Sequence, residues 1–315
     1  MLMSRTSLSP MTLGGLRLTV IMAMLLTSFA THASLKVAAS TPDLAALVAE
    51  IGGEHVTVTP LSRPNEDPHY VDPKPSLVIT LARADLLVFN GLELEIGWLP
   101  PIRTNSRNAA IQMGGAGDFD ASRYIEPMDM HLESNRAMGD IHPGGNPHFL
   151  YDPRNGARIA TALGTKLAEL APEKRAFFVK SAKAVADKLM ALAKKETARF
   201  AALKPEQRRV VTYHRSLVYV LDWLGIDRPM TIEPRPGISP SPSHVARVLG
   251  VMRAQQVRTI IQERFYPGKT SETLARMAKA QVLMLDGGAL YAEKGELYTN
   301  RIQRMAEEIY GTLAR

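Results

Sequence analysis

Three histidines and one aspartate have residue types and local sequences that suit a metal site. His69 and His148 lie in turns of similar sequence, DPHYVDPKPS and NPHFLYDPRN, and this likeness suggests a shared target. His214 and Asp286 each directly follow an apolar run that predicts a strand. Three imidazoles and one carboxylate suit tetrahedral zinc, and a harder ion such as manganese is the alternative. The separations of the four residues match no short zinc motif, so spacing alone is a weak signal.

The elements that must position these side chains alternate along the chain. Apolar runs predict strands at 35–40, 55–61, 85–91, 208–214, 257–263 and 281–287. Amphipathic runs predict helices at 41–53, 75–84, 216–225, 241–256 and 270–280. This alternation predicts an α/β fold of parallel sheets flanked by helices, in which ligands bind at the carboxyl ends of the strands. His69, His214 and Asp286 are all expected at such an edge.

One long amphipathic run divides the chain into two lobes. Residues 171–204 contain no proline or glycine beyond Pro172 in the first turn, which favours a single helix. At about 1.5 Å per residue, such a helix would span about 45 Å and serve as a backbone between lobes. We therefore expect an N-terminal metal-binding lobe at 34–170, a linking helix, and a C-terminal metal-binding lobe at 205–315.

The first 33 residues predict an export signal. Arg5 and Arg17 precede the apolar stretch LTVIMAMLLTSFA, which is short for a bilayer span and leads to small residues before Ser34. A membrane anchor that is never cleaved is the alternative. The expected location of the mature protein is the periplasm.

The amino-acid composition limits the kinds of metal site and partner that the protein can have. The chain has no cysteine, which excludes disulfides, zinc fingers and iron–sulfur clusters, so a bound metal must use nitrogen and oxygen ligands. The formal net charge is +7, but Lys and Arg are interleaved with acidic residues along helical stretches. Because no basic stripe with stacking aromatics is visible, we expect no nucleic-acid partner.

Several motifs together resemble the zinc- and manganese-binding solute-binding proteins of bacterial ABC importers, the family that includes the zinc-uptake periplasmic proteins. The motifs are DPHYVDPKPS, ADLLVFNGLELE, GDIHPGGNPHFLYDP, VVTYHRSLVYVLDWLG, EPRPGISPSP, and VLMLDG followed by YTN. The resemblance covers residues 34–315. It implies two α/β lobes joined by one long helix, with the metal in the cleft between them.

The resemblance also implies that His69, His148, His214 and Asp286 are the metal ligands. A histidine at position 214 is typical of the zinc-binding members, whereas manganese members tend to carry a carboxylate there. The implied function is that of a monomer, not an enzyme, that captures Zn(II) and delivers it to the ABC permease in the inner membrane.

Other functions remain open at this point. A manganese-binding importer component, with Mn(II) as the bound solute, a zinc metallochaperone and an adhesin would use the same site. A zinc hydrolase would need an open metal position for water, which a carboxylate ligand closes, and the sequence has no H-E-x-x-H motif.

The chain departs from the family pattern in two places. A long loop rich in histidine and acidic residues is common between the first two ligands, but residues 100–142 contain only His131 and His142. Gly287 follows Asp286 where proline is common. We therefore expect a reduced scavenging role, a more mobile loop after Asp286, and Asp286 as the least secure ligand.

Other polar residues are expected to have lesser roles. His142 is expected to be a solvated loop residue, and the alternative is that it orients His148 or recruits metal. Glu263 is expected at the cleft, accepting an imidazole N–H. Arg215 is expected to pair with Asp286 or Glu263. Surface positions are expected for His55, His131 and His244.

Overall fold

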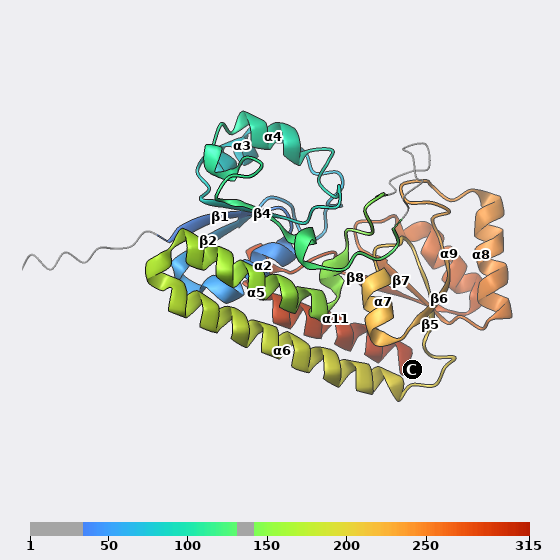
Figure 1. Ribbon diagram of the computed structural model, residues 1–315. Helices are drawn as coiled ribbons and strands as arrows, with labels where there is room; N and C mark the ends of the chain where they lie inside the picture. The colour runs from blue at the N-terminus through green and yellow to red at the C-terminus, as the bar shows by residue number, and fades with distance from the viewer. Residues whose placement is uncertain (1–33, 131–141) are drawn as a thin grey trace, which may run out of the picture. The chain divides into compact units, whose positions relative to one another are not determined.

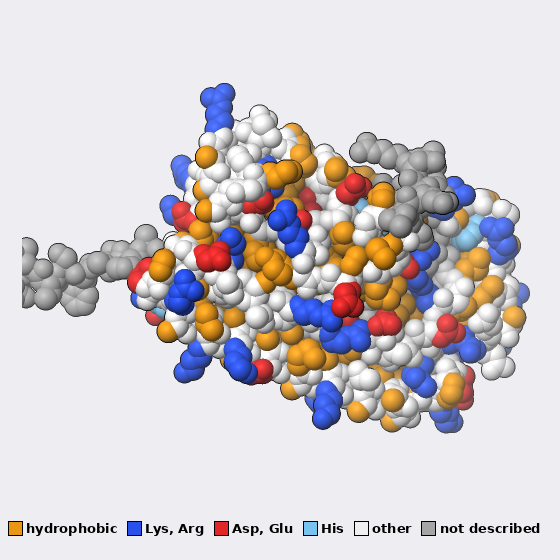
Figure 2. Space-filling view, in the orientation of Figure 1, with side chains coloured by type: hydrophobic (Ala, Val, Ile, Leu, Met, Phe, Trp, Pro, Cys, Tyr) orange, Lys and Arg blue, Asp and Glu red, His pale blue; other side chains and the backbone are white. Residues whose placement is uncertain are grey.

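The computed structural model describes residues 34–130 and 142–315 (Figure 1). The expected signal peptide at 1–33 and the histidine at position 131 lie outside the described residues. Within the described ranges, no helix is both long and apolar enough to cross a membrane. On the face shown in Figure 2, side chains of both charges are interspersed with apolar ones.

Four parallel strands form the first sheet, in the order β2-β1-β3-β4. The strands are β1 (Leu35–Ala39), β2 (Val56–Pro60), β3 (Leu86–Phe89) and β4 (Asp118–Asp120), and the helices beside them are α2 (Pro42–Gly52), α3 (Pro75–Ala82) and α4 (Leu99–Asn105). Helix α2 begins as predicted, because the Thr41 side chain accepts a hydrogen bond from the backbone N–H of Leu44. We call this sheet and its helices the first lobe.

The second sheet also has four parallel strands, in the order β6-β5-β7-β8. The strands are β5 (Arg209–Thr212), β6 (Asp227–Thr231), β7 (Thr259–Glu263) and β8 (Gln281–Leu285). The helices of this second lobe are α7 (Val218–Leu224), α8 (Pro242–Ala254), α9 (Gly268–Ala278), α10 (Tyr291–Lys294) and α11 (Tyr298–Leu313). The predicted α/β class with parallel sheets is confirmed.

Helix α6 (Arg175–Ala201) connects the lobes and packs along α5 (Pro153–Leu170). The expected helix from residue 171 starts later, because Ala171 leaves the helical conformation at φ −135° and ψ 78° and a 3₁₀ turn, Pro172–Lys174, follows. Helix α6 contacts α2 of the first lobe and α7 and α11 of the second, as its course in Figure 1 shows. A long helix therefore joins the two lobes, as predicted.

Hydrogen bonds also tie the lobes together at the start of α11. The hydroxyl of Tyr298 donates to the carbonyl oxygen of Leu150 at 2.7 Å. The side chain of Glu50, on α2, accepts hydrogen bonds from both the backbone N–H and the hydroxyl of Thr299, at 2.9 and 2.7 Å. These bonds fix the start of α11 against the first lobe.

Candidate metal site

Three of the four residues expected to bind metal lie together. His69 is on the loop after β2, His148 lies shortly before α5, and His214 follows β5. The ring centroids of His69 and His148 are 5.1 Å apart, those of His148 and His214 are 5.7 Å apart, and those of His69 and His214 are 6.1 Å apart. Imidazoles from both lobes therefore meet at one place.

Two carboxylates that the sequence interpretation missed hold two of these imidazoles. Asp67 Oδ1 lies 2.7 Å from His69 Nδ1 and also accepts the backbone N–H of His69. Glu233 Oε2 lies 2.6 Å from His214 Nδ1. A carboxylate at Nδ1 keeps the proton on that nitrogen and leaves the Nε2 lone pair free to bind a metal.

The two carboxylates lie at very different sequence distances from the histidines that they contact. Asp67 stands two residues before His69 in the DPH turn, so its contact is local. Burial raises the pKa of Asp67, but the hydrogen bonds from His69 outweigh burial and bring it below the usual value. Glu233 is 19 residues away from His214, and only the fold brings the two together.

His148 differs from the other two imidazoles. Its Nε2 atom is buried and has no hydrogen-bond partner among the described residues. Burial lowers the pKa of His148 well below its usual value, and the neighbouring His69, His214 and His142 lower it further. His148 is therefore neutral at neutral pH, which is the form that binds a metal.

The lowered pKa of His148 predicts how stability depends on pH without metal. Below about pH 6.5 the unfolded chain protonates this histidine while the folded protein does not, so the unfolded state binds more protons. We therefore expect the free energy of unfolding to fall as the pH drops from about 7 to about 5.5, measured by urea denaturation with a chelator present. His148→Gln should flatten this dependence, and an equal slope in both proteins would contradict the prediction.

His142 is part of the same cluster, and the expectation of a solvated loop residue is wrong. Its Nε2 atom lies 3.2 Å from Nε2 of His69, with the ring centroids 5.3 Å apart. The residue is half-buried. Its backbone oxygen accepts the N–H of Gly145 at 3.0 Å, so His142 opens the turn that leads to His148.

Asp286 forms ion pairs with two arginines. Its Oδ1 accepts from Arg264 Nε and its Oδ2 from Arg304 Nη1, both at 2.9 Å. The next residue, Gly287, has no room for a side chain, because a Cβ there would overlap the ring of Phe265. Close packing, rather than a need for mobility, therefore accounts for Gly287.

Glu263 is completely buried at the end of β7. Its Oε1 accepts a hydrogen bond from the hydroxyl of Ser216, while its Oε2 has no hydrogen-bond partner among the described residues. Burial raises its pKa, and the hydrogen bond from Ser216 and the nearby His214 oppose that rise. The expectation that Glu263 accepts an imidazole N–H is wrong, since His214 donates to Glu233.

Two further expectations were wrong. Arg215 pairs with Asp129, with 2.8 Å between Nη2 and Oδ2, rather than with a carboxylate of the second lobe. His244 is buried on α8, and its Nε2 lies 3.0 Å from the carbonyl oxygen of Thr231. Arg215 therefore ties the segment before residue 131 to the second lobe, and His244 is a packed residue.

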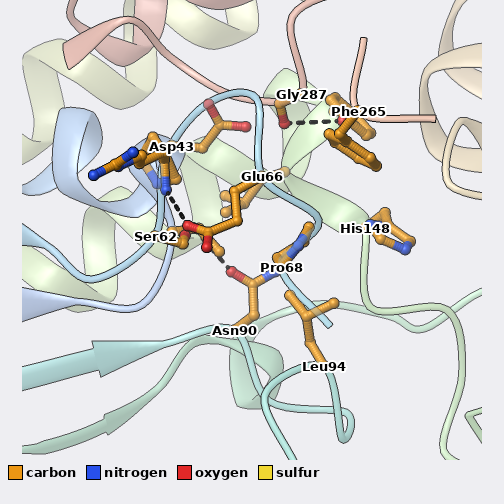
Figure 3. A pocket seen from close by; sticks show the side chains of 14 residues that line it. Asp43, Ser62, Glu66, Pro68, Asn90, Leu94, His148, Phe265 and Gly287 are labelled. Atoms are coloured by element: carbon orange, nitrogen blue, oxygen red, sulfur yellow. Dashed lines mark hydrogen bonds between the residues drawn. The ribbon is translucent and has the colours of Figure 1, made fainter. Parts of the chain in front are cut away.

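A small cavity of about 40 Å³ opens beside His148 (Figure 3). Its lining includes Asp43, Ser62, Glu66 and Asn90 from the first lobe and Phe265 and Gly287 from the second. In the part of the chain that the structure describes, no group of three His, Asp or Glu side chains is already arranged to hold a metal ion.

Solved structures share this fold over most of the chain. A crystal structure of ZnuA matches with a TM-score of 0.74 at 23% identity, covering 89% of this chain and 99% of that chain. A manganese-bound mutant of a periplasmic metal binding protein from Candidatus Liberibacter asiaticus matches with a TM-score of 0.72 at 21% identity, covering 89% and 100%. This chain therefore shares its fold with both solved structures.

The sequence gives the family. The model of the family described as zinc-uptake complex component A, periplasmic, matches residues 37–312, and the chain belongs to this family. The metal ABC transporter substrate-binding lipoprotein SsaB of Streptococcus sanguinis is 22% identical over 287 residues, covering 89% of this chain and 90% of the relative. The manganese ABC transporter substrate-binding lipoprotein PsaA of Streptococcus mitis is 23% identical over 288 residues, with the same coverage. These matches confirm the resemblance drawn from the motifs.

Proposed function

We propose that the protein captures a divalent metal ion with His69, His148 and His214 and delivers it to the permease of an ABC importer. The observation that carries the proposal is that three imidazoles from both lobes lie together. In two of them, Nδ1 is hydrogen-bonded to a carboxylate. Membership of a zinc-uptake family and relatives named as ABC transporter substrate-binding proteins support it. The protein then works as a monomer in the periplasm, after export by its first 33 residues.

Asp286 is the candidate that the sequence supplies for a fourth ligand. To reach a metal ion, its carboxylate would have to leave both Arg264 and Arg304. The side chain of Asp286 is only 15% exposed, so water compensates little for the lost ion pairs. Asp286 as a ligand therefore implies a rearrangement at the end of β8.

We expect Zn²⁺ to be the preferred cargo. Imidazole nitrogen suits zinc, and the general affinity order of divalent ions places Mn²⁺ well below Zn²⁺. Competition titration against a chromophoric chelator should give a lower Kd for Zn²⁺ than for Mn²⁺. His214→Glu is the matched variant: the added oxygen ligand should narrow the preference for zinc. Tighter binding of Mn²⁺ by the wild-type protein would refute this assignment.

Delivery to an importer is tested in cells. A strain without this protein should grow poorly in medium depleted of zinc by a chelator, because uptake loses its binding component. The wild-type gene should restore growth, whereas a gene carrying His148→Ala should not. Full growth of the strain without the protein, in cells that have no second zinc importer, would contradict the role in uptake.

A further inference from the structure

His142 and His69 face each other with the spacing of two ligands on one metal ion. Zinc–nitrogen bonds of about 2.0–2.1 Å in a tetrahedron place neighbouring ligand nitrogens about 3.3 Å apart. The two Nε2 atoms are 3.2 Å apart. These two imidazoles could therefore share a zinc ion with little change in the distance between their nitrogens.

The hydrogen bonds around His69 define which nitrogen carries the proton in this contact. Because Asp67 accepts from His69 Nδ1, the Nε2 atom of His69 carries a lone pair and accepts. His142 Nε2 must then donate its proton to His69. For both Nε2 lone pairs to bind one metal ion, His142 would have to move its proton from Nε2 to Nδ1, so that its imidazole stays neutral.

His142 joins the cluster through His69, with 5.3 Å between the two ring centroids, and His69 in turn lies 5.1 Å from His148 and 6.1 Å from His214. The carboxylate expected at the fourth position is engaged elsewhere, since Asp286 receives one hydrogen bond from Arg264 and one from Arg304. An imidazole is thus better placed than this carboxylate to complete the shell.

We propose that His142 is a ligand of the bound metal and completes a shell of four imidazoles with His69, His148 and His214. This inference rests on the proposed function, because it assigns a further ligand to the same site. A shell of four nitrogens favours zinc over manganese more strongly than a shell that includes a carboxylate. Asp286 remains paired with Arg264 and Arg304 and stabilises the loop after β8.

The experiment measures the zinc affinity of the full mature chain and its variants by competition with a chelator. We expect His142→Ala to weaken zinc binding by about tenfold or more, the scale on which even residues that only orient ligands act. Asp286→Asn should have a smaller effect than His142→Ala. His55→Ala is the matched control, because His55 contacts Phe177, away from the cluster. His142→Gln serves as a second variant if the alanine form does not fold.

X-ray absorption at the zinc edge supplies an independent readout. The wild-type protein should show four imidazoles around the ion, and His142→Ala should show three and an oxygen. Unchanged affinity in both His142 variants, or three imidazoles in the wild type, would overturn the assignment of His142. Absence of zinc binding by the wild type, or full binding by His148→Ala, would instead overturn the proposed function.

Discussion

Replacing His148 by alanine is expected to lower the affinity for zinc by about a hundredfold or more, since loss of residues that only orient ligands already costs about 10–100-fold. The imidazole is buried and neutral, and its Nε2 has no competing hydrogen-bond partner in the described part of the chain. It is therefore ready to bind a metal without losing other bonds. Competition titration with a chromophoric chelator measures the loss.

His244→Ala is the matched control for this prediction. His244 is also a buried histidine, but its ring bonds Thr231 on the outer strand of the second sheet. The control should retain the zinc affinity of the wild type, although it loses some stability. Equal losses of affinity in the two variants would show that removal of any buried histidine disturbs the site indirectly, against our assignment.

Replacing Arg301 by methionine is expected to lower the free energy of unfolding by about 3–5 kcal/mol, the usual cost of breaking a buried ion pair. Arg301 on α11 is fully buried, and its Nε lies 3.8 Å from Asp43 Oδ1 at the start of α2. Its Nη2 donates to the carbonyl oxygen of Asp286 at 2.7 Å. Urea denaturation of the metal-free protein measures the change.

Replacing Asp43 as well tests whether the stability lost in Arg301→Met comes from a buried carboxylate left without its ion-pair partner. Burial raises the pKa of Asp43, and Arg301 opposes that rise. Asp43→Asn combined with Arg301→Met removes both charges and should recover part of the stability that Arg301→Met loses. If the double variant lost more free energy of unfolding than the two single variants lose together, an ion pair between the lobes would be contradicted.

The alternation of strands and helices could be predicted from the sequence because it depends on local patterns. The apolar runs that became β1, β2, β3, β5, β7 and β8 were recognised as strands. The edge strands β4 and β6 were missed, since β4 has only three residues and β6 contains Pro229, which a central strand disfavours. Short edge strands depend on pairing with a neighbour, and pairing is not visible in a local pattern.

The three histidines of the candidate site were expected from the sequence, but most of the side chains that hold them were not. His69, His148 and His214 stood in recognisable turns or after strands, and the fold brings them together. Glu233 meets His214 only after β6 is placed beside β5. The position of Asp286 depended likewise on Arg304, which reaches it from α11. Such contacts depend on packing between elements that are distant in sequence.

A crystal structure of the zinc-loaded protein, with anomalous diffraction recorded at the zinc edge, tests the central claim most directly. We expect one strong anomalous peak in the cleft, bonded to Nε2 of His69, His148 and His214 at about 2.0–2.1 Å, the usual zinc–nitrogen distance. Zinc bound elsewhere, with none of these three imidazoles bonded to it, would contradict the account.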